Sequence, residues 1–240
     1  METKQLKIFI DFDGTITKVD VGNVIFKHFG DEEKGNEIIS KLRSGAITAR
    51  QCWEMLNDSV TSVDKNKLHQ LIDDVEIDDA FYSFINFCKK NELDVIVLSD
   101  GFDYYIDRIF KRENLSHLTY YSNHLALTED NKMELSFPFY DSSCPTSANC
   151  KRNHVINNSS DEDFTIYIGD GNSDKYPVQF CDYIFAKKSL LKFCEAERIP
   201  FFPYATFDDV IKRFEELLSK KRLKKRHQAE LKRKEIYTLE

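Results

Sequence analysis

Two acidic residues, Asp11 and Asp13, follow a short apolar run at residues 6–10 (LKIFI). Side chains two positions apart on an extended segment point to the same side, so these carboxylates would repel each other unless a cation or a shared proton relieves them. Mg²⁺ binds carboxylate oxygens together with phosphate, and Gly14 permits a tight backbone turn beside an anion. The pair therefore predicts a metal-assisted site for a phosphorylated molecule, with a solvated turn after a strand as the plainer alternative.

Polar residues of suitable chemistry follow two further apolar runs. Ser99 ends one such run and precedes a predicted helix, whose first N–H groups could bind an anion. Asp170 and Asp174 follow the run at residues 164–168, and Lys151 could supply a positive charge. Each residue alone also fits an ordinary role as a helix cap, a loop residue or a surface lysine. Four acids, a hydroxyl and a cation near the ends of three strands together predict one site.

These runs belong to a longer alternation of predicted strands and helices. Such alternation predicts an α/β fold, a Rossmann-like core whose parallel sheet carries helices on both faces. In sheets of this kind ligands bind at the carboxyl ends of the strands, where the polar residues lie. The predicted strands are residues 6–10, 94–98, 117–121, 164–168, 183–185 and 200–202, with a small hairpin over 125–127 and 132–135.

Residues 17–90 show helical periodicity throughout and would form an α-helical insert between the first two strands. Further helices are predicted over residues 102–111, 151–157 and 207–218, with one more between the last two strands. Trp53, the single tryptophan, is expected in the core of the insert rather than as a platform for a ligand.

The composition is that of a folded chain with a basic end. Of the 240 residues 41% are apolar and 31% charged, and the formal net charge is −7. This apolar content excludes a disordered chain, and no run approaches the roughly 20 apolar residues of a membrane helix. The six cysteines include no C-x-x-C pair and are expected as buried thiols, with the state of Cys144 and Cys150 left open. We therefore expect a cytoplasmic protein without a membrane partner.

Residues 219–240 contain nine Lys or Arg and three Glu, so the rest of the chain is strongly acidic. An acidic body disfavours nucleic-acid binding, because phosphate contacts need a positive surface. The basic end is expected as a solvated, partly helical extension, and an acidic partner or nucleic acid is the alternative.

The string DFDGTI at residues 11–16 resembles the first motif of the haloacid dehalogenase (HAD) superfamily. Ser99, Lys151 and the acids at residues 169–174 resemble its second, third and fourth motifs. The helical insert resembles the superfamily's helical cap, so the resemblance covers roughly residues 6–175.

Further features narrow the resemblance to the phosphoserine phosphatase-like branch, and within it to the phosphatases of methionine salvage. These features are Asp20, the string SDGF at residues 99–102 and the ending at residues 193–207. Phosphoserine phosphatases usually carry Glu where Asp20 stands, so phosphoserine is the less favoured substrate within this branch.

The resemblance implies a phosphomonoesterase that works through a phosphorylated aspartate. Asp11 would attack phosphorus, and Asp13 would protonate the leaving alcohol and later activate water. The implied cofactor is Mg²⁺, held by Asp11, the backbone carbonyl of Asp13, Asp170 and Asp174. The implied phosphate-binding residues are Ser99, Asp100 and Lys151, and the candidates for substrate specificity are Asp20 and Gly101.

The predicted organisation has three parts: a HAD core of residues 1–16 and 91–218, a cap of residues 17–90 and a basic extension of residues 219–240. The predicted substrate is a small phosphorylated metabolite, with the enolate phosphate of methionine salvage as one candidate. Phosphoserine, phosphocholine-like compounds, a phosphotransferase of the same fold and a phosphate-binding module without turnover are the alternatives. The oligomeric state and the role of the basic end are left open.

Overall fold

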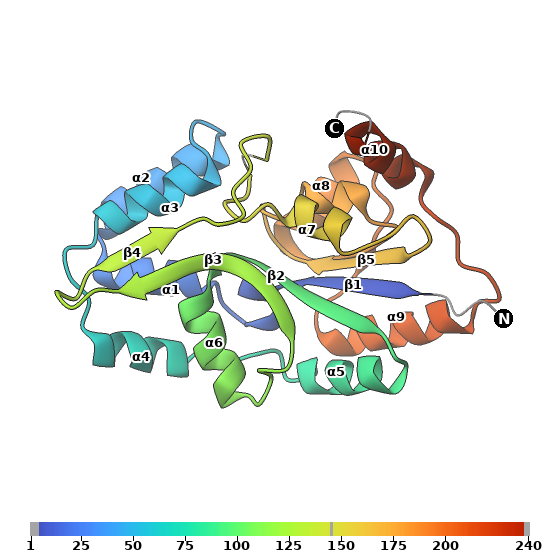
Figure 1. Cartoon of the computed structure of the whole chain (residues 1–240), viewed down its shortest axis with the longest axis horizontal. Helices are drawn as coiled ribbons and strands as arrows, with labels where there is room; N and C mark the ends of the chain where they lie inside the picture. The colour runs from blue at the N-terminus through green and yellow to red at the C-terminus, as the bar shows by residue number, and fades with distance from the viewer. Residues whose placement is uncertain (1–4, 145, 238–240) are drawn as a thin grey trace.

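In the computed structural model, which describes residues 5–144 and 146–237, seven strands form one mostly parallel sheet (Figure 1). Their order is β4-β3-β2-β1-β5-β6-β7, and only the β3–β4 pair is antiparallel. The strands are β1 Leu6–Asp11, β2 Asp94–Phe102, β3 Thr119–Leu127, β4 Met133–Ser136, β5 Phe164–Gly169, β6 Tyr183–Ala186 and β7 Phe202–Pro203. The predicted α/β class, the parallel sheet and the hairpin are confirmed.

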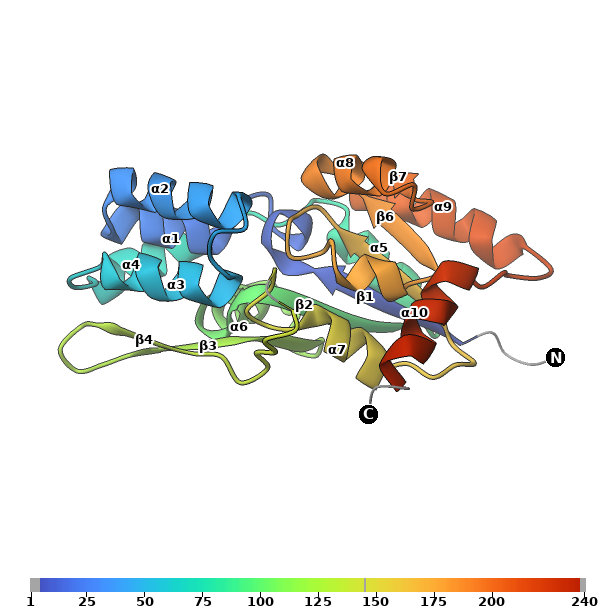
Figure 2. The same ribbon diagram turned by 90° about the horizontal axis from the view of Figure 1, so that it is seen from above.

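Helices cover both faces of the sheet, as predicted (Figures 1 and 2). Residues of β1 alternate between two cores: Ile8 and Ile10 pack with α5 and α9, whereas Phe9 packs with α7 and α8. This alternation is expected for a strand that is buried on both faces. The covering helices are α5 Phe81–Lys90, α6 Asp103–Arg112 and α9 Phe207–Ser219 on one face, and α7 Lys151–Asn157, α8 Lys188–Ala196 and α10 His227–Tyr237 on the other.

Four helices of the insert lie together at one end of the sheet (Figure 2). They are α1 Val21–Phe29, α2 Glu32–Arg43, α3 Ala49–Asp58 and α4 Lys65–Asp73. Each begins at a side chain that accepts a hydrogen bond from the first turn: Asp20, Asp31, Thr48 and Asp64. Capping of this kind stabilises helix starts and explains why these segments begin where they do.

The fifth helix of residues 17–90, α5, lies beside α9 under the sheet rather than with the other four (Figure 1). Phe81 and Phe84 contact Phe207, with ring centroids 4.9 and 5.0 Å apart. The division of the chain into core, cap and extension stays a prediction. These contacts favour a boundary before Phe81 in place of one after residue 90.

The basic end is not simply solvated, so that expectation is wrong for part of it. Arg226 donates to the carbonyl oxygens of Val178, Gln179 and Cys181, and α10 packs against the short 3₁₀ helix Pro177–Phe180. Arg233 is 3% exposed. The sequence of α10 has little hydrophobic periodicity, so the side of this helix that is buried could not be predicted from the sequence.

Among the described helices none has the length and apolar character needed to cross a bilayer. All six cysteines are free and buried, including Cys144 and Cys150, whose state the sequence left open.

Candidate active site

A buried lysine lies between two carboxylates at the ends of two paired strands. The ammonium of Lys151, the first residue of α7, donates to Asp11 Oδ1 at 2.5 Å and to Asp174 Oδ1 at 2.9 Å. The three side chains are at most 5% exposed. Burial raises the pKa of Asp11, the charge of Asp174 raises it further, and Lys151 opposes both effects. Burial also works against the charge of Asp174, but Lys151 and further hydrogen bonds hold the pKa of Asp174 below its ordinary value.

The loop after β5, which contains Asp174, also adds a third acid, Asp170, to this group. Asp170 Oδ2 accepts from Lys188 Nζ at 2.8 Å, and the backbone N–H of Asp170 donates to Asp174 Oδ2 at 3.0 Å. Tyr167 Oη donates to the other oxygen of Asp174 at 2.7 Å. Asp174 is thus held by donors on both oxygens, whereas Asp170 lines the pocket.

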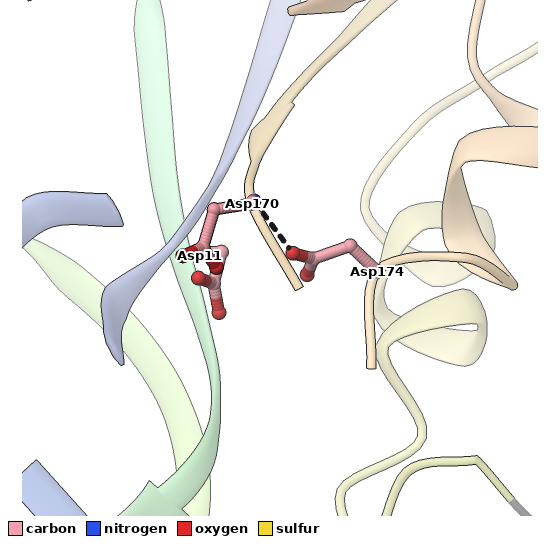
Figure 3. Close-up of side chains that lie close together, drawn as sticks. All are labelled: Asp11, Asp170 and Asp174. Atoms are coloured by element: carbon pink, nitrogen blue, oxygen red, sulfur yellow. Dashed lines mark hydrogen bonds between the residues drawn. The ribbon is translucent and has the colours of Figure 1, made fainter. Parts of the chain in front are cut away.

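Asp11, Asp170 and Asp174 form a group that suits a divalent cation (Figure 3). One oxygen of each carboxylate lies within 4.8 Å of the others. Three buried carboxylates carry more negative charge than Lys151 and the half-exposed Lys188 neutralise. An all-oxygen donor set with residual negative charge fits Mg²⁺. The carboxylate of Asp13 lies outside this group, so the expected relief of an Asp11–Asp13 pair by one metal is not what the side chains show.

Asp13 lies in the tight turn after β1 and is held by three donors. Asp13 Oδ1 accepts from the backbone N–H of Val21 at 2.9 Å, and Oδ2 accepts from Ser99 Oγ at 3.0 Å and Tyr105 Oη at 2.9 Å. Burial, with the charge of Asp20 as the second cause, raises the pKa of Asp13 to about 7 despite these hydrogen bonds. A carboxyl group with such a pKa can both donate and accept a proton near neutral pH.

The turn around Asp13 depends on a glycine. Gly14 has φ +76°, and a Cβ at this position would lie 2.5 Å from Asp170 Oδ2. A side chain there would therefore displace an acid of the cluster as well as strain the backbone.

The segment before Lys151 is tied to the end of β2. Asp100 Oδ1 accepts from Ser147 Oγ at 2.7 Å and from the backbone N–H groups of Ala148 and Asn149 at 2.5 and 2.9 Å. The amide of Asn149 donates to the carbonyl of Ser99 at 2.8 Å. These bonds fix where α7 begins and so where the ammonium of Lys151 lies.

A pocket of about 230 Å³ lies between the acids and the helical insert. Its acidic side includes Asp11, Asp13 and Asp170, with Asp20 at the start of α1. Of the described residues that line it, Arg43 alone carries a positive charge. The apolar side comes from α2 and α3 and consists of Ile39, Leu42, Ala49, Cys52, Trp53 and Leu56.

Trp53 has two roles in this arrangement. Its ring packs against Phe26 and Phe102, with centroids 5.5 and 5.1 Å apart, and it also lines the pocket. The expectation that it belongs to the core of the insert is therefore right only in part.

The structure brings the predicted site residues into one region, and their assigned roles stay predictions. Asp100, Asp20 and Gly101 line the pocket with the acids. Ser99 and Lys151 are fully buried beneath it and contact Asp13 and Asp11.

Sequence reasoning missed Tyr105, Arg43 and Lys188. Tyr105 lies on the apolar stripe of α6, where periodicity indicates only core. Arg43 and Lys188 are basic residues without a motif. Only the folded chain shows that Arg43 lines the same pocket as the acids and that Lys188 contacts Asp170.

A sequence model of the family described as Putative Phosphatase matches residues 6–193. Pdp3-interacting factor 1 of Schizosaccharomyces pombe is 29% identical over 223 residues, which cover 90% of this chain and 97% of that protein. A 2-hydroxy-3-keto-5-methylthiopentenyl-1-phosphate phosphatase of Bacillus cytotoxicus is 28% identical over 223 residues, which cover 90% of this chain and 99% of that protein.

Solved structures of phosphoserine phosphatase share the fold. One, of a phospho-aspartyl intermediate analogue, has a TM-score of 0.68 at 20% identity and covers 89% of this chain and 99% of its own. A substrate-bound complex has a TM-score of 0.67 at 19% identity with the same coverage. The chain therefore belongs to the Putative Phosphatase family and is a phosphatase with the haloacid dehalogenase fold that its motifs predict.

Proposed function

We propose that the protein is a Mg²⁺-dependent phosphomonoesterase that hydrolyses a small phosphorylated metabolite through an aspartyl-phosphate at Asp11. One observation supports this most strongly: Asp11 lines the pocket while Lys151, Asp170 and Asp174 surround its buried carboxylate. Such a carboxylate is fixed in place and has little water to compete with it, as a nucleophile requires.

In the first half of the proposed reaction, an oxygen of Asp11 forms a bond to phosphorus while the bond from phosphorus to the alcohol oxygen breaks. Asp13 gives its proton to that oxygen, which leaves as the neutral alcohol. In the second half, Asp13 takes a proton from water, whose oxygen attacks phosphorus, and Asp11 leaves as a carboxylate. A pKa of about 7 suits Asp13 to both proton transfers.

Asp11, Asp170 and Asp174 would hold Mg²⁺, together with the backbone carbonyl of Asp13. The bound ion would neutralise negative charge on the phosphate. Lys151 limits the repulsion between Asp11 and Asp174 and opposes the rise in the pKa of Asp11 that burial causes, and a bound cation would favour the ionised form further. In this proposal Ser99 and the N–H of Asp100 contact phosphate oxygens, as Lys151 does.

The pocket also bears on the leaving group. Six apolar side chains face the acids across about 230 Å³, which favours an alcohol with a hydrocarbon or thioether portion. The enolate phosphate of methionine salvage has that character, and a relative carries the corresponding name. The cytoplasm is the proposed location, because such a metabolite would be found there.

Phosphoserine is the second candidate, and one observation favours it. Arg43 and Asp20 line the pocket with opposite charges, so they could pair with the carboxylate and the ammonium group of an amino acid.

A panel of phosphorylated metabolites assayed with Mg²⁺ tests the proposal. We expect hydrolysis of p-nitrophenyl phosphate that EDTA abolishes, and a higher kcat/KM for the enolate phosphate than for phosphoserine or phosphocholine. Arg43→Met should raise KM for phosphoserine only if that compound is the substrate. Absence of turnover on every phosphate would favour a binding module and contradict the proposal. Transfer to an added alcohol in preference to water would instead indicate a phosphotransferase.

A further inference from the structure

Tyr105 places a hydroxyl group beside Asp13 from within the core. It lies on α6 and is 1% exposed as a residue, and its ring contacts the rings of Phe12 and Phe102 at centroid distances of 6.1 and 6.4 Å. Tyr105 Oη donates to Asp13 Oδ2 at 2.9 Å. Among the described residues Asp13 is the partner that the structure gives this hydroxyl. A phenylalanine would fill the same space, so packing alone does not account for the hydroxyl.

The backbone of β2 is shaped to admit that hydroxyl. A Cβ on Gly101 would lie 1.5 Å from Tyr105 Oη and 2.8 Å from Asp13 Oδ2. Pairing of β2 with β3 shifts register between Leu98 and Phe102, so the strand is irregular at this point. The sequence suggested Gly101 as a specificity residue. In the structure its lack of a side chain leaves room for the contact between Tyr105 and Asp13.

The two oxygens of Asp13 are held from different parts of the chain. Val21, at the start of the insert, donates to Oδ1, whereas Ser99 and Tyr105 donate to Oδ2 from β2 and α6. Without the Tyr105 hydroxyl, Ser99 alone would hold Oδ2. Ser99 Oγ also accepts from the backbone N–H of Gly101 at 3.0 Å, and in the proposed function its single hydroxyl hydrogen is directed to a phosphate oxygen, so Ser99 does not replace Tyr105 as a donor to Oδ2.

We infer that Tyr105 is a positioning residue, whose hydroxyl sets the direction in which Asp13 presents its carboxyl group to the oxygen of the leaving alcohol. This inference rests on the proposed function, in which Asp13 donates that proton as the bond to phosphorus breaks. If the Asp13 carboxyl group points in the wrong direction, departure of the alcohol slows, and it slows most for leaving groups that most need protonation.

Comparison of two substrates isolates this effect. p-Nitrophenolate leaves readily without a proton, whereas the alkoxide of an unactivated alkyl phosphate does not. Since kcat/KM covers only the steps up to departure of the alcohol, Tyr105→Phe should lower kcat/KM for the alkyl phosphate roughly tenfold more than for p-nitrophenyl phosphate. Asp13→Asn should give the same pattern with a larger difference, and Tyr105→Phe should add nothing to it in the Asn background.

Tyr104→Phe is the matched control. It removes a hydroxyl from the neighbouring residue, where Tyr104 Oη contacts His69 Nε2 at 2.8 Å. We expect both substrates to be hydrolysed by this variant as by wild type. The wild-type enzyme serves as the reference for the proposed function itself, because absence of turnover there would contradict that function before any variant is compared.

Three results would overturn the inference in a wild-type background that turns over both substrates. The first is a Tyr105→Phe enzyme that loses equal factors on the two substrates, and the second is one that loses nothing. The third is a Tyr105→Phe protein that does not fold, which would show that the hydroxyl serves stability rather than the orientation of Asp13. Thermal unfolding of each variant separates this third result from the others.

Discussion

At the scale of single residues, the site depends on how buried charges are compensated. Lys151 contacts both Asp11 and Asp174 without any exposure to solvent, and each of the three would be costly to bury alone. The ammonium keeps the pKa of Asp11 from rising as far as burial and Asp174 would take it. The same lysine therefore compensates buried negative charge in the fold and favours the ionised form of the proposed nucleophile.

Lys151→Met should lower both turnover and stability, because it leaves two buried carboxylates without their shared partner. Loss of a buried partner costs about 3–5 kcal/mol of the free energy of unfolding, and loss of a charge-stabilising group typically lowers kcat by about 10²–10³. Denaturant unfolding and steady-state assays measure the two effects. Lys188→Met is the comparison, since that lysine is 55% exposed and contacts only Asp170 among these acids. Turnover of Lys151→Met within an order of magnitude of wild type would contradict this role.

At the scale of elements, the strands and the residues at their ends could be predicted from the sequence. The side-chain contacts that other elements make with those residues could not. The apolar runs before Asp11, Ser99 and Asp170 are buried parallel strands, because a strand covered on both faces has a continuous apolar sequence. Their carboxyl ends meet, which brings the acids together as the sequence predicts. Tyr105 shows the limit: helical periodicity indicates that its ring is buried, but not that its hydroxyl donates to an acid in the turn after β1.

α7 and the segment before it are linked to each other and to β3 through a buried histidine. His154, on α7, stacks on Tyr121 with ring centroids 4.2 Å apart, and its Nε2 contacts Asn149 Oδ1 at 2.6 Å. Asn149 in turn donates to the carbonyl oxygens of Ser99 and Tyr121. The histidine therefore supports the segment that leads into Lys151.

Burial lowers the pKa of His154 to about 4 from its ordinary 6.5, so the unfolded chain binds its proton first as pH falls. The stability that the neutral ring contributes is complete above pH 6.5 and is lost as pH falls toward 4. This difference is worth up to about 3 kcal/mol. We expect His154→Gln, which keeps an amide near Asn149 but does not titrate, to flatten the dependence of unfolding free energy on pH over that interval. Parallel curves for variant and wild type would show that His154 does not titrate as described.

At the scale of the whole molecule, the basic end closes back onto the sheet. Asp182 Oδ1 accepts from the backbone N–H of Arg226 at 3.0 Å and lies 3.5 Å from Arg233 Nη2. Arg233 Nη1 also donates to Phe180 O and Thr165 Oγ1 at 3.0 and 3.1 Å. In the sequence these basic residues are compatible with a nucleic-acid surface. In the structure part of their positive charge is buried, where it lies beside Asp182.

Arg233→Ala should destabilise the protein by about 3 kcal/mol, because it leaves Asp182 buried with a missing partner. Arg222→Ala, an exposed change in the same basic segment, should alter the free energy of unfolding by no more than about 0.5 kcal/mol. Denaturant unfolding of both variants measures the difference. Equal stabilities of the two variants would mean that the docking of α10 contributes little.

The covalent state of Asp11 during turnover tests the central claim most directly. The enzyme would be mixed with Mg²⁺ and a substrate that it hydrolyses, quenched in acid within one turnover, digested and analysed by mass spectrometry. We predict one added phosphoryl group on the peptide that contains Asp11, and none when Asp11→Asn is treated in the same way. An unmodified peptide from an enzyme that is turning over, or a phosphoryl group on another residue, would contradict the account.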